Sequence, residues 1–254
     1  MPQPTDELRA LVEGYLAGLA LTPELGTLQG PMRHALGGKR VRPVLLLATG
    51  DAVGAPLEQL LPAAAAVELV HSFSLVHDDL PSLDDDRERR GAPSVWAQYG
   101  EAAAILAGDA LLAEALRLAL TYPTPAVARE LVDATLAMIG GQQLDIEGGS
   151  QLEHLHALKT GALLSAAVMC GLWAAEVPVA EHPGWRLFAG ELGLLFQIVD
   201  DLLDGDGYVL EVGEEAALRL VGEAAERAHT RLGAVDGDTT VLASIVDELA
   251  VRTA

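Results

Sequence analysis

The sequence has one cysteine, few aromatic residues and a shortage of basic side chains. Cys170 is that cysteine, so the chain can build neither a disulfide framework nor a zinc site of cysteines. Lysine and arginine number 16 against 37 aspartates and glutamates, which gives a formal net charge of -21. Because an acidic surface repels the phosphate backbone, the composition argues against a nucleic-acid partner. Ligand chemistry must therefore rest on oxygen and nitrogen atoms.

The sequence also lacks a long hydrophobic run and a targeting signal. The longest uncharged stretch, residues 160–175, is shorter than the roughly 18 to 20 residues needed to cross a bilayer, so we expect a buried core helix and no membrane span. The first residues include Asp6 and Glu7 and have neither a basic start nor an apolar run. This pattern predicts a cytoplasmic protein.

What the sequence does have is apolar residues at helical spacing over most of its length. Leu8, Val12, Tyr15 and Leu16 form one such stripe, and Ile105–Leu120 repeats the pattern, whereas no convincing strand alternation occurs. Proline and glycine collect between the periodic segments, and none of the breaks is long or polar enough for a flexible linker. We therefore predict one all-α domain over residues 1–254, a bundle of roughly ten or more helices.

Two acidic clusters each end an otherwise apolar helix. The first runs from Asp78 to Asp86, and the second is Asp200-Asp201-Leu202-Leu203-Asp204. Two carboxylates about 5 Å apart repel by roughly 3 kcal/mol at an effective dielectric of 20, so a cation must offset the charge unless the groups are well solvated. Asp200 and Asp204 share a helix face, and Pro81 can turn Asp84 back toward Asp78. Carboxylates without imidazole or thiolate suit Mg²⁺, which also takes oxygens from substrate phosphates.

Six of the sixteen cationic residues fall in two short runs. These are Lys39-Arg40-x-Arg42 and Arg87-x-Arg89-Arg90. Guanidinium groups bind phosphate oxygens bidentately and lysine acts as a point charge, so the runs indicate an anion site, with a solvated basic surface as the plainer alternative. Together with metal-binding acids and apolar helices, they predict a site that binds an apolar diphosphate and helps the diphosphate leave.

At this point the sequence resembles a known family, the trans-isoprenyl diphosphate synthases of the polyprenyl synthetase type. The resemblance is closest in pattern to bacterial farnesyl and geranylgeranyl diphosphate synthases and covers about residues 30–207. It rests on six motifs in order, which are Gly37-Gly38-Lys39-Arg40-Val41-Arg42-Pro43, residues 71–91, Gly108-Asp109, Gly140-Gly141-Gln142 with Asp145, Lys159-Thr160-Gly161, and Phe196-Gln197 followed by the second acidic cluster.

The resemblance implies a helical bundle around a central cavity, a homodimer, and roles for individual residues. The aspartates implied to hold Mg²⁺ on the allylic diphosphate are Asp78, Asp79, Asp84, Asp200, Asp201 and Asp204, with Asp78, Asp84 and Asp200 as the preferred direct ligands. The resemblance implies that isopentenyl diphosphate binds to Lys39, Arg42, His71 and Arg90. It implies that the allylic diphosphate contacts Arg89. The residues implied to hold the leaving diphosphate and stabilise the allylic cation are Lys159, Thr160 and Gln197.

The family pattern also bears on product length. Phe73 stands five residues before Asp78, and in the family an aromatic residue there resembles the farnesyl diphosphate synthases. A ring about 7.5 Å along the helix from the metal ligands blocks a longer tail. Ser74 is small and leaves Phe73 as the obstruction. We expect farnesyl diphosphate as the product, with geranylgeranyl diphosphate as the alternative.

The sequence departs from the family pattern after Asp204. Members usually carry further lysines there, whereas this chain has no lysine beyond Lys159, from which we expect a tighter dependence on Mg²⁺ or slower turnover.

Three other functions stay open. The first is a class I terpene cyclase, which would have a different second motif and no isopentenyl diphosphate site. The second is a non-catalytic subunit of a heteromeric synthase, although such subunits commonly lose an aspartate motif and both motifs are present here. The plainest alternative is a helical Mg²⁺ or phosphate-binding protein.

Overall fold

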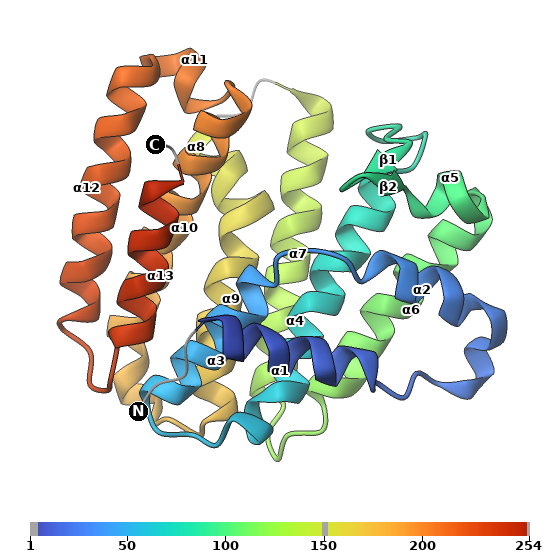
Figure 1. Cartoon of the computed structure of the whole chain (residues 1–254), viewed down its shortest axis with the longest axis horizontal. Coiled ribbons are helices and arrows are strands. Elements are labelled where there is room, and N and C mark those ends of the chain that lie inside the picture. The colour runs from blue at the N-terminus through green and yellow to red at the C-terminus, as the bar shows by residue number, and fades with distance from the viewer. Residues whose placement is uncertain (1–4, 149–151, 253–254) are drawn as a thin grey trace.

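The computed structural model describes residues 5–148 and 152–252, and within them the chain forms the bundle of helices that the sequence predicts (Figure 1). The expected α-helical class is confirmed. In chain order the elements are α1 Thr5–Ala17, the 3₁₀ turn η1 Pro23–Leu28, α2 Gln29–Ala35, α3 Val41–Ala52, α4 Leu57–Asp78, β1 Glu88–Arg89, β2 Ala92–Pro93, α5 Val95–Tyr99, α6 Glu101–Ala119, α7 Ala126–Glu147, α8 Leu152–His156, the π-helical turn η2 Ala157–Gly161, α9 Ala162–Ala174, the 3₁₀ turn η3 Val179–Glu181, α10 His182–Asp204, α11 Tyr208–Val212, α12 Glu214–Leu232 and α13 Thr240–Val251.

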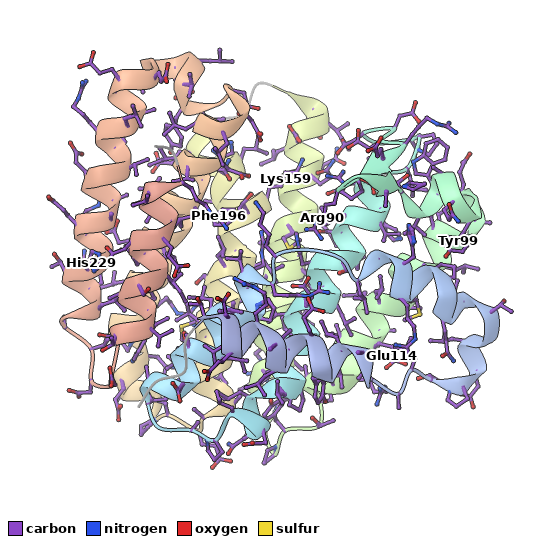
Figure 2. All side chains as sticks on the ribbon, in the orientation of Figure 1. Arg90, Tyr99, Glu114, Lys159, Phe196 and His229 are labelled. Carbon is purple, nitrogen blue, oxygen red and sulfur yellow. The ribbon has the colours of Figure 1, made fainter. Side chains whose placement is uncertain are left out.

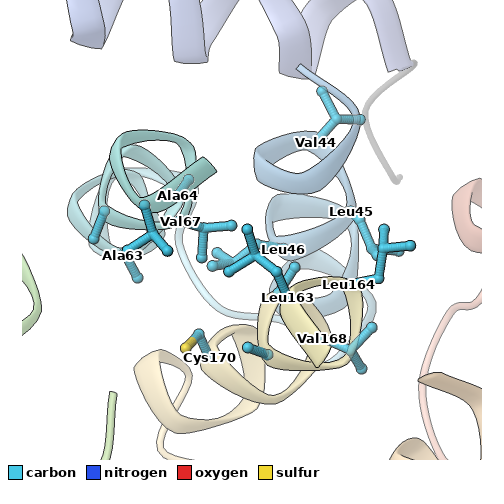
Figure 3. Close-up of a cluster of buried hydrophobic side chains, with 14 of the residues drawn as sticks. Val44, Leu45, Leu46, Ala63, Ala64, Val67, Leu163, Leu164, Val168 and Cys170 are labelled. Carbon is cyan, nitrogen blue, oxygen red and sulfur yellow. The ribbon is translucent and has the colours of Figure 1, made fainter. Parts of the chain in front are cut away.

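Helix α4 lies in the middle of the bundle and packs against α3, α6 and α9. Its alanines 63–66 are buried, and such small side chains let neighbouring helices approach closely. Figure 3 shows Ala63, Ala64 and Val67 of this helix facing Leu46 of α3 and Leu163 of α9. Because the core holds α4 on several sides, the acidic residues at its C-terminus are fixed relative to the other helices.

Two helical stretches are long and apolar enough to cross a membrane by length and composition alone. They are Leu57–Asp78 and Leu152–Ala174, and 67% and 56% of their most apolar windows are buried inside the bundle. The second contains all but the last residue of the uncharged run 160–175, for which we expected a core helix, and the residues of α9 from Ala166 to Leu172 are buried. Both stretches therefore pack as core helices of this fold.

Helix α4 contains a proline in its interior, and a tyrosine side chain forms hydrogen bonds with the backbone groups that are left without helical partners there. Pro62 has no N–H and disturbs the preceding turn. The hydroxyl of Tyr122 lies between the separated groups: it donates to the carbonyl oxygen of Gln59 over 2.7 Å and accepts from the N–H of Ala63 over 3.1 Å. A side chain inserted into the helical ladder in this way keeps both backbone groups satisfied.

We expect Tyr122→Phe to lower the free energy of unfolding by about 1–2 kcal/mol, because it leaves two buried backbone groups without their partner. The measurement is urea denaturation at equilibrium. Tyr99→Phe is the matched control, since Tyr99 is exposed, and it should change the free energy little. Equal stability of the two variants would show that the hydroxyl does not support the helix.

The structure contains two short strands where the sequence analysis found no convincing strand. β1 and β2 pair antiparallel, with Glu88 opposite Pro93 and Arg89 opposite Ala92. The connecting residues, Arg90 and Gly91, both have positive φ, which is the geometry of a tight hairpin turn. The sequence missed this element because two-residue strands are too short to show an alternating pattern.

Candidate active site

A cavity of about 660 Å³ opens between the loop before α3, helix α4, the turn η2 and helix α10. Both lysines of the chain, Lys39 and Lys159, line it. Figure 2 shows Lys159, Arg90 and Phe196, which come from distant parts of the sequence, gathered in one region of the bundle. The predicted site residues that line this cavity together are Lys39, Arg42, His71, Ser74, Asp78, Arg90, Lys159, Thr160 and Asp200.

The first acidic cluster turns back on itself as the proline spacing predicts. The N–H of Asp84 donates to the carbonyl oxygen of Asp78 over 2.9 Å, so the chain reverses directly after α4. Burial raises the pKa of Asp78 to about 6, with a further rise from the charge of Asp84, while Lys159 acts in the opposite direction. The cluster thus places a carboxylate whose negative charge is poorly compensated at the wall of the cavity.

Asp79, the neighbour of Asp78, points elsewhere. It is buried and forms an ion pair with Arg89, whose Nε donates to Asp79 Oδ1 over 2.9 Å. Both residues line a separate cavity of about 230 Å³ beside the β1–β2 hairpin. Burial raises the pKa of Asp79, and the hydrogen bond from Arg89 opposes this rise. The structure therefore joins Asp79 and Arg89 to each other and leaves the larger cavity to Asp78.

The second acidic cluster divides in the same way. Asp200 lines the cavity, and its pKa is raised by burial and by the nearby charge of Asp204, the exposed last residue of α10. Asp201 is buried and accepts hydrogen bonds from Gln197 Nε2 over 2.7 Å and from the N–H of Tyr208 over 2.9 Å. It fixes the start of α11 to the end of α10. Gln197 lines a neighbouring cavity of about 470 Å³.

The donor set of the cavity suits a hard divalent cation. Among residues 5–148 and 152–252, no group of three or more histidine, cysteine or acidic side chains is placed to hold a metal ion unaided. Asp78 and Asp200 instead reach the cavity from two helices, and each has a raised pKa because its ionised form is poorly compensated. A cation that shares its remaining positions with water and phosphate oxygens matches this arrangement, which is the coordination habit of Mg²⁺.

Basic residues also form part of the cavity wall. The Arg90 guanidinium lies against the glycine loop and donates to the carbonyl oxygen of Gly37, and a Cβ at Gly38 would collide with it. His71 Nε2 is 3.4 Å from Arg90 Nη2. Burial and the charges of Arg42 and other arginines hold the pKa of His71 well below its ordinary value, so the imidazole is neutral at neutral pH. The wall can therefore bind an anion through cations and one neutral ring.

Lys159 and Thr160 belong to the π-helical turn η2, an irregularity that often marks functional positions. Lys159 Nζ is 2.5 Å from Asp145 Oδ2 on α7. The helix and the turn can approach this closely because Gly141 has no side chain: a Cβ there would lie 2.7 Å from the backbone nitrogen of Lys159. Gly141, the second glycine of the motif, thus allows the close approach that positions the lysine in the cavity.

Phe73 lines a second cavity of about 290 Å³, which continues from the first along α4 and α7. The two cavities share Ser74, Asp78, Met138 and Lys159. The Phe73 ring packs edge-on against His77, with ring centroids 5.3 Å apart. An apolar chain that extends from the acidic cluster along this path therefore meets the aromatic ring that the sequence analysis singled out.

The structure adds residues that the sequence analysis left without a role. Glu68, Phe196 and Arg252 line the larger cavity, and Asp145 pairs with Lys159. Asp145 follows Gly141 by four residues, so helical spacing placed it on the same face of α7. Glu68 was visible as the one charged residue in the apolar run that leads to the first acidic cluster.

The fold and the cavity together define a helical bundle that brings carboxylates and basic side chains from distant segments to one cavity. The chain belongs to the polyprenyl synthetase family, whose model matches residues 26–217. The family predicted from the six motifs is therefore confirmed.

Individual relatives agree with this assignment. The chain is 39% identical over 194 residues to the farnesyl diphosphate synthase of Bacillus subtilis, covering 70% of this chain and 66% of that protein. It is 43% identical over 192 residues to the geranylgeranyl diphosphate synthase of Cyanophora paradoxa, covering 68% and 64%. The matched part thus spans about two thirds of these relatives. The crystal structure of a geranyltransferase from Legionella pneumophila superposes with a TM-score of 0.87 at 30% identity, covering 98% of this chain and 96% of that one.

Proposed function

We propose that the protein is a Mg²⁺-dependent prenyltransferase, one domain over its whole length, that joins isopentenyl diphosphate head-to-tail to dimethylallyl or geranyl diphosphate and releases pyrophosphate. One observation carries the proposal: a single cavity collects Asp78 and Asp200 from both acidic clusters, both lysines, and Arg42 at the start of α3. The two relatives named above are synthases of farnesyl and geranylgeranyl diphosphate, which supports the substrate class.

The residues of the cavity have two roles in the proposed reaction, one toward each substrate. Lys39, Arg42, His71 and Arg90 bind the diphosphate of isopentenyl diphosphate and hold its alkene still. Asp78 and Asp200 would hold the divalent cations, with Asp84 and Asp204 beside them. When bound, these ions supply positive charge that stabilises the departing pyrophosphate. Lys159 and Thr160 bind the same leaving group, and we assign Gln197, which donates to Asp201, to the support of that group.

No protein nucleophile takes part in this reaction. The bond from the allylic carbon to the diphosphate oxygen breaks, the alkene of isopentenyl diphosphate attacks the resulting allylic cation, and the new cation then loses a proton. Pyrophosphate is itself the base that accepts the proton. Because bond formation needs both substrates, the protein should release pyrophosphate only when isopentenyl diphosphate and an allylic diphosphate are present together. Release from the allylic diphosphate alone would instead favour a class I terpene cyclase.

Farnesyl diphosphate is the proposed product, because Phe73 lies on the path of the growing chain. We expect Phe73→Ala to shift the products from farnesyl to geranylgeranyl diphosphate, since the smaller side chain opens the cavity beside α7. Products are identified by chromatography after dephosphorylation. Ser74→Ala removes an oxygen without opening comparable space and should leave the products unchanged. An unchanged distribution for Phe73→Ala would place the length limit elsewhere in the cavity.

A homodimer is the proposed assembly, because α6 and α7 expose several large apolar residues. Those residues are Ile105, Leu106, Val132, Leu136 and Ile139, each at least 39% exposed. An apolar surface of this kind is typical of a subunit interface. We expect a dimer in sedimentation analysis and a monomer for Leu136→Asp. A monomeric native protein would contradict the assembly.

The cytoplasm is the proposed compartment, in keeping with core helices that bury most of their apolar length. A non-catalytic subunit of a heteromeric synthase is the main rival within the family. The presence of Asp78 and Asp200 in one cavity with Lys159 favours an active enzyme over that rival. Turnover by the purified chain alone decides between the two.

A further inference from the structure

Arg40 behaves differently from the two basic residues on either side of it. Its side chain is only 4% exposed, and its backbone has a positive φ of 58°, which a non-glycine residue rarely adopts. The guanidinium turns back under its own loop, where Nη2 donates to the carbonyl oxygen of Leu36 over 2.5 Å and Nη1 to that of Gly37 over 3.2 Å. Arg40 thus fixes the loop through hydrogen bonds to the carbonyl oxygens of Leu36 and Gly37.

Two carboxylates hold the Arg40 guanidinium in turn. Glu68, in the middle of α4, accepts from Nη1 over 2.6 Å, and Glu13 of α1 accepts from Nε over 2.8 Å. Glu68 is only 2% exposed, so this pair is shielded from water and from salt. Residues 37–42, called the basic loop below, comprise the loop with Lys39 and the first two residues of α3, the second of which is Arg42. Arg40 therefore ties this segment to two helices.

Glu68 also balances charge beyond this pair. It lines the cavity together with Arg42, His71 and Arg90, and it stands one helical turn before His71 on α4. Burial lowers the pKa of both Arg42 and Arg90, and the charge of Glu68 opposes the change in each. Without a buried anion, the clustered guanidinium groups would repel one another before any substrate arrives.

We infer that Glu68, acting through Arg40, is a positioning residue that fixes the basic loop in its binding geometry. The inference rests on the proposed function, because it assigns the loop to isopentenyl diphosphate. Glu68 does not touch the substrate in this account. It keeps Lys39 and Arg42 in place, so that the diphosphate meets a site already formed.

The test is Glu68→Gln, which keeps the shape of the side chain and removes its charge. We expect the KM for isopentenyl diphosphate to rise about ten-fold, because a small displacement of binding groups has large effects on a preorganised site. The KM for geranyl diphosphate should stay within about two-fold, since the proposed site of that substrate is around Asp78 and Asp200 and not at the basic loop. Arg40→Lys, which keeps the charge but not the planar fork, should produce the same split.

The control is a buried glutamate of the same kind outside the cavity. Glu114 on α6 is 3% exposed and accepts hydrogen bonds from the N–H of Thr22 over 3.0 Å and from Arg117 over 2.5 Å. Figure 2 shows it well apart from Arg90 and Lys159. Glu114→Gln should lower the thermal midpoint and leave both KM values unchanged, which is what a purely structural role predicts.

Two further measurements keep the outcome decisive. If Glu68→Gln does not fold, Glu13→Gln replaces it, because Glu13 is half-exposed and its loss weakens the same arginine. Calorimetry with isopentenyl diphosphate as the probe needs no turnover, so weaker binding by the variant supports the inference even if the proposed reaction fails. Unchanged binding of isopentenyl diphosphate by Glu68→Gln and Arg40→Lys, or an equal rise of both KM values, would overturn the inference. The proposed function would still stand if the native protein turns over.

Discussion

Asp78→Asn and Asp200→Asn should each reduce turnover by about 10²–10³-fold, because each removes a carboxylate from the wall that would hold the divalent cations. The same substitutions should not destabilise the protein. Burial raises the pKa of both carboxyl groups, so at neutral pH their ionised forms are disfavoured by the fold, and a neutral amide removes that penalty. The measurements are steady-state turnover and the midpoint of thermal unfolding at pH 7.5.

The combination of lost activity and kept or raised thermal midpoint separates a functional carboxylate from a structural one. Asp133→Asn is the control, because Asp133 is exposed on α7, and it should change neither quantity. Retention of activity within about five-fold by Asp78→Asn or Asp200→Asn would contradict the role assigned to that residue.

Gly141→Ala should reduce turnover by about 10–100-fold through the backbone. The added Cβ would lie 2.7 Å from the backbone nitrogen and 3.0 Å from the Cα of Lys159, and backbone atoms cannot move aside as a flexible side chain can. The turn η2 must therefore shift, and it carries Lys159 and Thr160 out of position.

The neighbouring glycine provides a closely matched control. A Cβ at Gly140 meets nothing within 4 Å, so Gly140→Ala has room and replaces a poor helix former by a good one. It should leave turnover unchanged and raise the free energy of unfolding slightly. Turnover is compared for the two purified variants, and equal turnover would show that the contact between α7 and η2 does not position Lys159.

Much of this architecture could be predicted, because the spacing of apolar residues indicates where a helix runs and the acidic clusters indicate where two of the helices end. The apolar runs before Asp78 and Asp200 become α4 and α10, which end at Asp78 and Asp204. Pro81 turns Asp84 back to Asp78 as expected. The ordered motifs identified the family, and those that contain Lys39, Asp78, Lys159 and Asp200 supply residues that line the cavity.

What the sequence could not show is which member of a charged pair faces the cavity. Successive residues of a helix point about 100° apart, so Asp200 and Asp201 cannot both face one ligand, and packing decides that Asp201 turns inward to Gln197 and Tyr208. In the basic loop the choice depends on φ. Arg40 adopts a left-handed conformation that sends its side chain beneath the loop, and nothing in the pattern Lys39-Arg40-x-Arg42 predicts it.

The departure from the family pattern after Asp204 now has a structural setting. Where relatives are expected to carry lysines, α11 begins directly at Tyr208 and is tied to Asp201. Among the described residues, Arg252 at the end of α13 is the cation from this part of the chain that lines the larger cavity. The expectation of a stronger Mg²⁺ dependence therefore stays a prediction, to be measured by titrating Mg²⁺ at saturating substrates.

The most direct test of the whole account is a product analysis with the purified chain. Protein, Mg²⁺ and labelled isopentenyl diphosphate are incubated with dimethylallyl, geranyl or farnesyl diphosphate in turn, and the dephosphorylated products are separated by chromatography. We expect labelled farnesol from the first two primers and no elongation of farnesyl diphosphate. Labelled geranylgeraniol would keep the transferase and reject the role of Phe73, whereas no labelled product with any primer would contradict the proposed activity itself.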